Sequence, residues 1–227
     1  MDNPHCGQTR HLKPRSNVRS KRENIVRWLA LVLAGVGLVL VAGGCSTSAT
    51  SRPTADQMLQ SLETSNKVTQ NSKYVASYRA LGSASTTVYA QAPPVFALRV
   101  KGPGSFTQVM VANRGKTTSC ANYGSGTKCV TTTASNVSMA IQSPQGTYGI
   151  MAMMRELIGR GVPVTVSYRN FAGLSATCFT AKGKVNTNTD CFTQSGILAM
   201  ETGTSSQLSG SELTSYSPNV TPSDLTP

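Results

Sequence analysis

Residues 73–123 read KYVASYRALGSASTTVYAQAPPVFALRVKGPGSFTQVMVANRGKTTSCANY, and apolar and polar side chains alternate along most of this stretch. Tyr74, Ala76 and Tyr78 fall on one side of an extended chain, while Ser77 and Arg79 fall on the other. Such a period of two is typical of β-strands with one buried face. The pattern predicts strands over 73–80, 86–91, 96–100, 106–112 and 117–123. Because short turn sequences separate these segments, we expect an antiparallel meander.

The rest of the chain repeats the arrangement of a helix followed by strands. Apolar side chains recur at helical spacing in 55–70 and 148–160, and Thr54 is a good N-cap for the first of these helices. Further strands are predicted over 129–133, 162–170, 176–180, 191–193, 197–201 and 207–216. Residues 137–141 fit either element type, and the proline-rich residues 218–227 are expected to form a frayed or edge-lying tail.

Neither an internal repeat nor a second linker interrupts residues 55–217, which we interpret as one α+β domain. Its length is ample for a hydrophobic core. The expected architecture is an extended, curved antiparallel sheet, resembling half a barrel, packed against two or more helices on one face. We expect a monomer.

The N-terminus has the order of features found in an export signal. Seven basic and two acidic residues precede the apolar run 28–44, which ends in Ala42-Gly43-Gly44 before Cys45. This run is short for a membrane-spanning helix, which needs about 20 apolar residues. The interpretation is a bacterial lipoprotein signal peptide, 1–44, that is removed while Cys45 is acylated, with 45–54 as a flexible tether. An uncleaved single-pass anchor is the alternative.

Both interpretations place the domain on the outer face of the cytoplasmic membrane. The complete chain has a formal net charge of +12, but the removed segment holds 7 of its 21 basic and 2 of its 9 acidic residues, which leaves +7. A moderately basic domain on a tether is attracted to anionic lipid headgroups or acidic wall polymers. Nucleic acid is not expected as a partner in this compartment.

Four cysteines remain after Cys6 and Cys45 are set aside. They form two local pairs, Cys120 with Cys129 and Cys178 with Cys191, each across a polar segment that resembles a hairpin loop. Such pairs usually form disulfides in an oxidising compartment. Three connectivities are possible, and the local one is favoured because each loop can bring its own ends together. A four-thiolate zinc site is the weaker alternative, since its ligand pairs are usually closer in sequence.

The inventory of side chains argues against an enzyme. His5 and His11, the only histidines, both precede Cys45, so the exported part lacks the usual general base and metal ligand. Its carboxylates are scattered, and most are expected to face solvent; they are Asp56, Glu63, Glu156, Asp190, Glu201, Glu212 and Asp224. A glycosidase-like carboxylate pair could be assembled only across distant elements. We therefore expect no catalytic residue, no metal and no cofactor.

Several local features resemble known lipid carriers. A helix at 54–70 follows the lipobox, the strand Tyr74-Val75-Ala76-Ser77-Tyr78 comes next, and the segment 88–94 leads to Phe96-Ala97-Leu98-Arg99. This order is similar to that of half-barrel carriers of the LolA/LolB type and of actinobacterial envelope lipoproteins of the LppX/LprG type. The resemblance implies a concave sheet that holds acyl chains in an apolar cavity. The two cysteine hairpins are not part of that pattern.

The leading hypothesis is an envelope lipoprotein, anchored to the membrane, that binds a lipid or lipidated molecule between the sheet and the apolar helix faces. Methionine is flexible, so a wall built from it can adapt to acyl chains of different shape. The candidate lining residues are Phe96, Leu98, Val100, Met151, Met154, Leu157, Ile158, Val164 and Val166. The rival hypothesis is a domain without a cavity that serves as a structural or interaction partner of another envelope protein.

Overall fold

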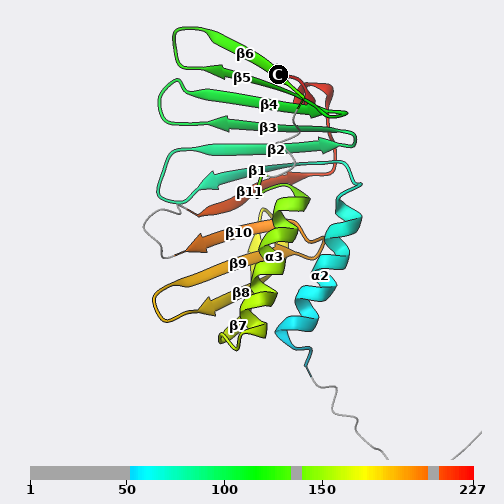
Figure 1. Ribbon diagram of the computed structural model, residues 1–227, viewed down its shortest axis with the longest axis vertical. Coiled ribbons are helices and arrows are strands. Elements are labelled where there is room, and N and C mark those ends of the chain that lie inside the picture. Colours follow the sequence, from blue (N-terminus) through cyan, green and yellow to red (C-terminus); the bar gives the residue numbers. More distant parts are fainter. Residues whose placement is uncertain (1–51, 134–139, 204–209) are drawn as a thin grey trace, which may run out of the picture. The chain divides into compact units, whose positions relative to one another are not determined.

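The alternating segments form one sheet of eleven antiparallel strands (Figure 1). The computed structural model describes residues 52–133, 140–203 and 210–227. The strands are β1 (Tyr74–Ala80), β2 (Thr86–Ala92), β3 (Val95–Lys101), β4 (Thr107–Asn113), β5 (Lys116–Asn122), β6 (Thr127–Thr132), β7 (Val164–Phe171), β8 (Leu174–Lys182), β9 (Thr187–Thr193), β10 (Leu198–Gly203) and β11 (Ser211–Ser217). Two helices pack together against this open sheet, so the predicted α+β class is confirmed.

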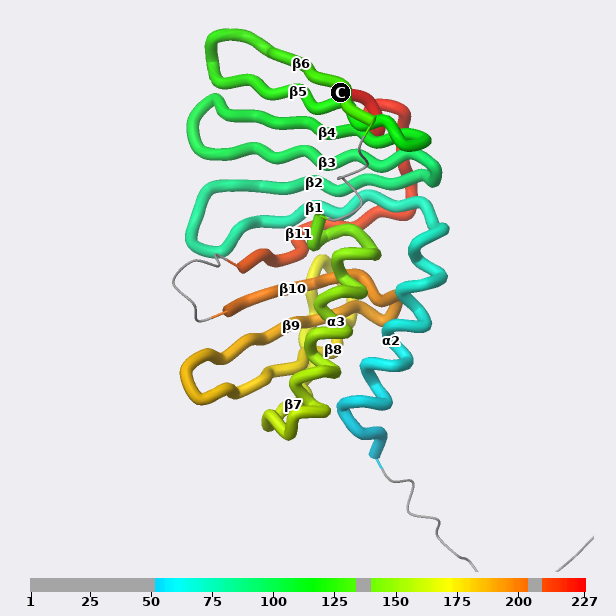
Figure 2. The backbone as a smooth tube through the Cα atoms, viewed as in Figure 1, coloured from blue at the N-terminus to red at the C-terminus, as the bar shows by residue number. Residues whose placement is uncertain are grey.

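The last strand joins two meanders. The strand order is β6-β5-β4-β3-β2-β1-β11-β10-β9-β8-β7, so β11 lies between the first strand of one meander and the last strand of the other (Figure 2). β11 pairs with β1 at six positions but with β10 at only two, Met200 opposite Glu212 and Glu201 opposite Ser211. The edge strand β7 also comes close to β11. The second meander therefore curves back towards the strand that joins it to the first.

Helix α2 (Ala55–Thr69) begins where the sequence predicts. The Thr54 hydroxyl accepts a hydrogen bond from the Gln57 backbone N–H, and the Gln57 side chain accepts one from the Thr54 backbone N–H. This reciprocal capping box satisfies two of the free N–H groups at the helix start. Asp56 lies in the first turn and Lys67 in the last, which suits the helix dipole.

Helix α3 (Pro144–Gly159) begins one turn earlier than the predicted residue Tyr148. Ser143 is the N-cap, and its hydroxyl accepts a hydrogen bond from the Gly146 N–H at 3.0 Å. Pro144 follows at a position where a helix needs no N–H donor. The glycines in the first turns hid this start, because glycine is a poor helix former.

Two clusters of buried side chains form the core. The first cluster contains Tyr74, Tyr78 and Leu213 from the strands around the join, together with Cys178 and Cys191 from the second meander. The Tyr78 hydroxyl donates a hydrogen bond to the Leu198 carbonyl at 3.0 Å. Residues of both meanders thus share one core across the β11 join.

The second cluster lies between the helices and the second meander. Its buried members are Leu59, Leu62, Ile150, Met151, Met154, Phe179, Ala181, Phe192 and Leu198. Phe179 and Phe192 stand on the opposite side of their strands from Cys178 and Cys191, so β8 and β9 are covered on both faces. The helices therefore cover only one half of the sheet, as Figure 1 also shows.

The C-terminal tail packs on the sheet instead of fraying or lying along an edge. The short 3-10 helix η2 (Pro222–Leu225) contacts β2 and β3, which are interior strands. The Arg99 guanidinium donates hydrogen bonds to the carbonyls of Ser223, Asp224 and Thr226. Hydrogen bonds from the Thr221 side chain and backbone lower the pKa of Asp224. The tail is held because one guanidinium supplies several donors in a fixed fork.

Some expectations from the sequence fall on residues outside the described ranges. They include the signal peptide 1–44, Cys45 with most of its tether, part of 137–141 and the start of the predicted strand 207–216. The elements from α2 to η2 belong to one compact unit, 51–227. Within the described ranges, no helix has both the length and the apolar character needed to span a membrane.

Candidate functional site

Both local disulfides are present. Cys120 is bonded to Cys129 across β5 and β6, and Cys178 is bonded to Cys191 across β8 and β9. The second disulfide is completely buried, whereas Cys129 is exposed on the edge strand. Structural disulfides of this kind are typical of domains that fold outside the cytoplasm.

The nine residues proposed to line a ligand cavity divide between the two clusters. Phe96, Leu98 and Val100 of β3 belong to or pack against the first cluster. The other six lie in or against the second cluster, namely Met151, Met154, Leu157, Ile158, Val164 and Val166. Met151 and Met154 are fully buried among Leu59, Phe179 and the other side chains of that cluster. The structure thus brings six of the nine together in packed core and places three elsewhere.

Three pockets formed by described residues are lined by no buried member of the second cluster other than Leu62. One has a volume of about 30 Å³ and is lined by Phe96, Gln91 and Ser143 among others. This is about the volume of one water molecule in the liquid, whereas ligand pockets usually measure roughly 300–1,000 Å³. The other two, of about 280 and 380 Å³, are open grooves on the surface.

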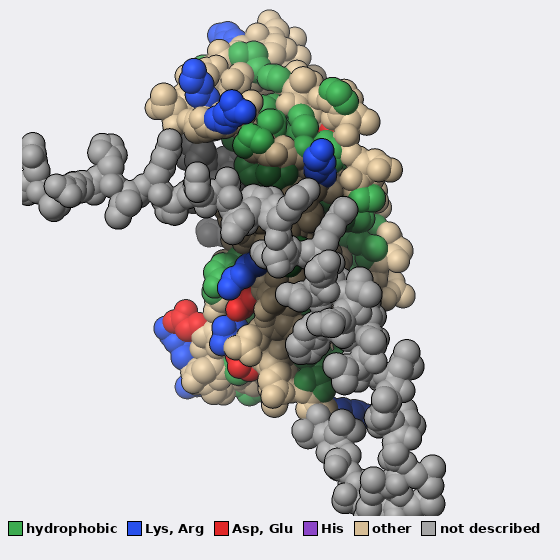
Figure 3. Space-filling view, turned by 90° about the vertical axis from the view of Figure 1, so that its right-hand side faces the viewer, with side chains coloured by type: hydrophobic (Ala, Val, Ile, Leu, Met, Phe, Trp, Pro, Cys, Tyr) green, Lys and Arg blue, Asp and Glu red, His purple; other side chains and the backbone are tan. Residues whose placement is uncertain are grey.

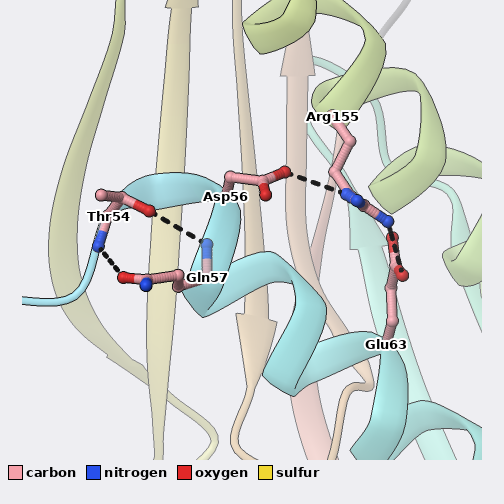
Figure 4. Close-up of polar contacts among 5 residues, drawn as sticks. All are labelled: Thr54, Asp56, Gln57, Glu63 and Arg155. Carbon is pink, nitrogen blue, oxygen red and sulfur yellow. Dashed lines mark hydrogen bonds and ion pairs between the residues drawn. The ribbon is translucent and has the colours of Figure 1, made fainter.

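An ion-pair network joins the two helices. The Arg155 guanidinium of α3 lies 3.0 Å from the Asp56 carboxylate and 3.2 Å from the Glu63 carboxylate, both on α2 (Figure 4). Hydrogen bonding to Asp56, followed by the charges of Glu63 and Asp56, raises the pKa of Arg155. Because Glu63 is buried, this network is a structural contact that holds α3 against α2.

The half of the sheet away from the helices is strongly basic. Residues 73–133, which form β1 to β6, contain seven basic residues and no Asp or Glu; the basic residues are Lys73, Arg79, Arg99, Lys101, Arg114, Lys116 and Lys128. In Figure 3, blue Lys and Arg side chains mark the upper half with green apolar side chains between them, and most red Asp and Glu side chains lie in the lower half. We call β1–β6 the basic half-sheet.

Strand β6 is the outer edge of the basic half-sheet, and all six of its residues are exposed. Lys128 and Val130 point to the same face of the strand, and Val130 is 63% exposed. The opposite edge, β7, is partly covered, because Val164 and Val166 pack against the second cluster and Phe171 is buried in the first. An edge strand leaves a row of backbone N–H and C=O groups without partners. Of the two sheet edges, β6 is therefore the more accessible.

Sequence reasoning missed a pair of adjacent carboxylates in the second meander. Asp190 and Glu201 are directly paired across β9 and β10, and Asp190 is only 2% exposed. Burial, followed by the neighbouring Glu201 charge, raises the pKa of Asp190 to about 7, and burial also raises the pKa of Glu201. The sequence pattern alone places Asp190 among the scattered carboxylates, most of which are expected to face solvent. Its position beside Cys191, which predicts a core strand, is the local signal of its burial.

The buried tyrosines do not offer acid–base chemistry near neutral pH. Burial raises the pKa of Tyr74, Tyr78 and Tyr89 above its ordinary value of 10.0, so all three hydroxyls remain protonated. The Tyr89 hydroxyl donates to the Gln91 side chain, whose amide in turn donates to the Thr69 and Ser72 carbonyls at the end of α2. These groups tie the helix to the sheet.

Comparisons with known proteins leave the family open. The sequence matches no protein-family model and no curated protein. Among solved structures, the chain is similar to MucB in complex with MucA(peri), with 12% identity, a TM-score of 0.42 and 72% of this chain covered. It is also similar to PNGF-II in two space groups, with 10% identity, TM-scores of 0.31 and 0.32, and 64% of this chain covered. The matches span 55% of the MucB chain and 27% and 28% of the PNGF-II chains.

Proposed function

We propose that this protein is an envelope protein that binds an acidic protein partner by strand addition at β6. The observation that carries the proposal is that every residue of Thr127–Thr132 is exposed at the edge of the basic half-sheet. Main-chain hydrogen bonds supply affinity in this mode of recognition, and alternate side chains supply specificity. The role assigns the protein no catalytic step.

The edge is already held in the conformation that strand addition needs. β5 and β6 pair at six positions, and the disulfide between the opposed residues Cys120 and Cys129 locks their register. A strand ordered in advance loses little conformational freedom when a partner binds. The exposed Lys128 and Val130 side chains offer a charged and an apolar contact on one face of the added strand.

Charge defines the chemistry of the expected partner. Arg79 lies 3.7 Å from Glu212, and Arg99 holds the tail, whereas no ion pair in the described ranges involves Lys101, Lys116 or Lys128. A basic surface of this kind accelerates association with an acidic partner and makes the rate sensitive to salt. We therefore expect an extended segment that carries Asp or Glu beside apolar residues.

Photo-cross-linking in the native envelope tests this role. A benzophenone amino acid is placed at Val130, and the matched control places it at Val185, which is 90% exposed between β8 and β9. We expect a discrete, protease-sensitive adduct at Val130 that is absent at Val185. Equal labelling at the two positions, or no protein adduct at Val130, would contradict strand addition at β6.

We also propose that acylated Cys45 anchors the domain to the outer face of the cytoplasmic membrane. The basic N-terminus, the apolar run and the small residues before Cys45 support this anchor. A chain acylated more than once remains bound, whereas one acyl chain alone binds only marginally. Cys45→Ala should abolish palmitate labelling and signal-peptide removal, and Cys6→Ala should leave both unchanged. Labelling that survives Cys45→Ala excludes this anchor.

A hydrophobic ligand is the second candidate, and it is favoured by an apolar row on the basic half-sheet. Leu98, Met110 and Val130 lie on one face of β3, β4 and β6, with Ser119 of β5 between the last two, and Met110 and Val130 retain solvent exposure. Acyl chains on this row beside Lys128 would suit an anionic lipid. Mass spectrometry of an organic extract decides: stoichiometric lipid in the protein purified from its host supports this ligand, and a lipid-free protein rejects it.

A further inference from the structure

Three oxygen-bearing side chains stand in one row across β9, β10 and β11. Asp190 is directly opposite Glu201, and Glu201 is directly opposite Ser211. Directly paired residues project from the same face of a sheet, with Cβ atoms about 4.5–5.5 Å apart. The row therefore places two carboxylates and a hydroxyl side by side.

Two atoms of this row are buried without a hydrogen-bond partner. They are Oδ2 of Asp190, a residue that is 2% exposed, and Oγ of Ser211, a residue that is 8% exposed. None of the ion pairs in the described part of the chain involves Asp190 or Glu201. Buried polar atoms nearly always have a partner, and a buried carboxylate needs a counter-charge or a proton. A proton meets this need on Asp190 below its pKa of about 7, whereas above it the row has no counter-charge among the described ion pairs.

The row lies where the two meanders join. β10 and β11 pair at only two positions, and one of them is Glu201 with Ser211. Gly210 permits this close approach, because a Cβ atom there would lie 2.0 Å from the Glu201 carbonyl oxygen. A group bound by the row would therefore link β9, β10 and β11. Among the described strand pairs, β10 and β11 have the fewest paired positions.

We propose that Asp190 and Glu201 bind a divalent cation that prefers oxygen ligands, with Ca²⁺ as the expected ion, and that Ser211 holds a water bound to this ion. Carboxylate, hydroxyl and water oxygens are the ligands of such cations. The described residues contain no group of three or more His, Cys, Asp or Glu that could hold a metal, so water would supply the remaining ligands of an ion bound by these two carboxylates. A doubly charged cation neutralises both carboxylates, and its bound water gives the buried Ser211 oxygen a partner.

Calorimetric titration of the full-length, chelator-treated protein with CaCl₂ tests the proposal. Sites with few charged ligands bind Ca²⁺ with Kd values of about 10⁻⁴–10⁻³ M, which is the range expected here. Because Asp190 must release its proton to bind a cation, affinity should rise between about pH 6 and pH 8. Saturating Ca²⁺ should also raise the thermal unfolding temperature.

Asp190→Asn and Glu201→Gln should each weaken Ca²⁺ binding at least tenfold, and Ser211→Ala should weaken it less. Glu212→Gln is the matched control, since Glu212 follows Ser211 on the same strand but pairs with Met200 and contacts Arg79. If Asp190→Asn does not fold, the Ca²⁺ affinities of Glu201→Gln and Ser211→Ala still test the proposed site. The proposal is overturned if Ca²⁺ gives neither heat nor a thermal shift up to about 10 mM, well above the expected Kd. Equal affinity in Glu201→Gln and Glu212→Gln also overturns it.

Discussion

Asp190 is buried, although the sequence groups it with carboxylates that are mostly expected to face solvent. A polar residue in a strand usually faces solvent when only one face of the sheet is covered. β9 is covered on both faces, by the Cys191 side of the first cluster and by the Phe192 side of the second, so Asp190 has no route to solvent. Covering of this kind depends on how distant elements pack, and the neighbouring Cys191 indicates a core strand without showing which face Asp190 occupies.

The raised pKa of Asp190 predicts that stability falls as pH rises. Between its unfolded value of 3.8 and its folded value of about 7, the folded state keeps a proton that the unfolded state has lost. The free energy of unfolding should therefore decrease from about pH 4 to pH 7, by on the order of 4 kcal/mol in the absence of divalent cations. Asp190→Asn should remove most of this slope and Glu212→Gln should not, as measured by urea denaturation in chelator. An unchanged slope in Asp190→Asn would contradict the burial of a titrating carboxyl.

Substitution of Gly196, at the turn between β9 and β10, is expected to destabilise the fold. Its φ of +72° is unfavourable for other residues, and an added Cβ would lie 2.7 Å from the Asn66 nitrogen and the Leu62 carbonyl oxygen of α2. Gly173 has a similar φ of +78° but free space around it, which makes it the matched control. Gly173→Ala should cost about 1–2 kcal/mol from backbone strain. Gly196→Ala should lower the free energy of unfolding by about 1–3 kcal/mol more than Gly173→Ala, because its Cβ overpacks against α2. Urea denaturation measures both variants, and equal losses would contradict the close contact between Gly196 and α2.

At the scale of elements, local patterns predicted most of the structure. The alternation of Tyr74, Ala76 and Tyr78 and the capping residue Thr54 belong to elements whose ends match the prediction within one or two residues. The predicted start of α3 was wrong because the first turns of this helix contain glycines and its N-cap is a single serine, Ser143. The contact of η2 with the sheet was missed because it depends on Arg99, more than a hundred residues earlier in the chain.

Arg99 is expected to hold the C-terminal tail on the sheet. Arg99→Met keeps the length of the side chain but removes the donors to the Ser223, Asp224 and Thr226 carbonyls. Backbone amides in 221–227 should then exchange hydrogen faster, and the tail should become more sensitive to protease. Arg79→Met is the control, because Arg79 is exposed and contacts only Glu212 at 3.7 Å among the described ion pairs. Equal exchange in both variants would exclude this role of Arg99.

At the scale of the whole molecule, the sequence predicts the α+β class but not the path of the chain through the sheet. The insertion of β11 between β1 and β10 joins the two meanders and creates the row at Glu201. No local pattern specifies which strand lies beside which, since pairing depends on long-range contacts. The same limit explains why the predicted lining residues divide between two clusters, and why the accessible edge is found at β6.

Hydrogen exchange of the protein with the partner captured at Val130 tests the central claim most directly. Strand addition gives the free backbone N–H groups of an edge strand new acceptors, so their exchange should slow. The account predicts slower exchange in β6, Thr127–Thr132, and unchanged exchange in the other edge strand, Val164–Phe171. Protection confined to β7 or to the helices, with β6 unaffected, would contradict the assignment of β6 as the docking edge.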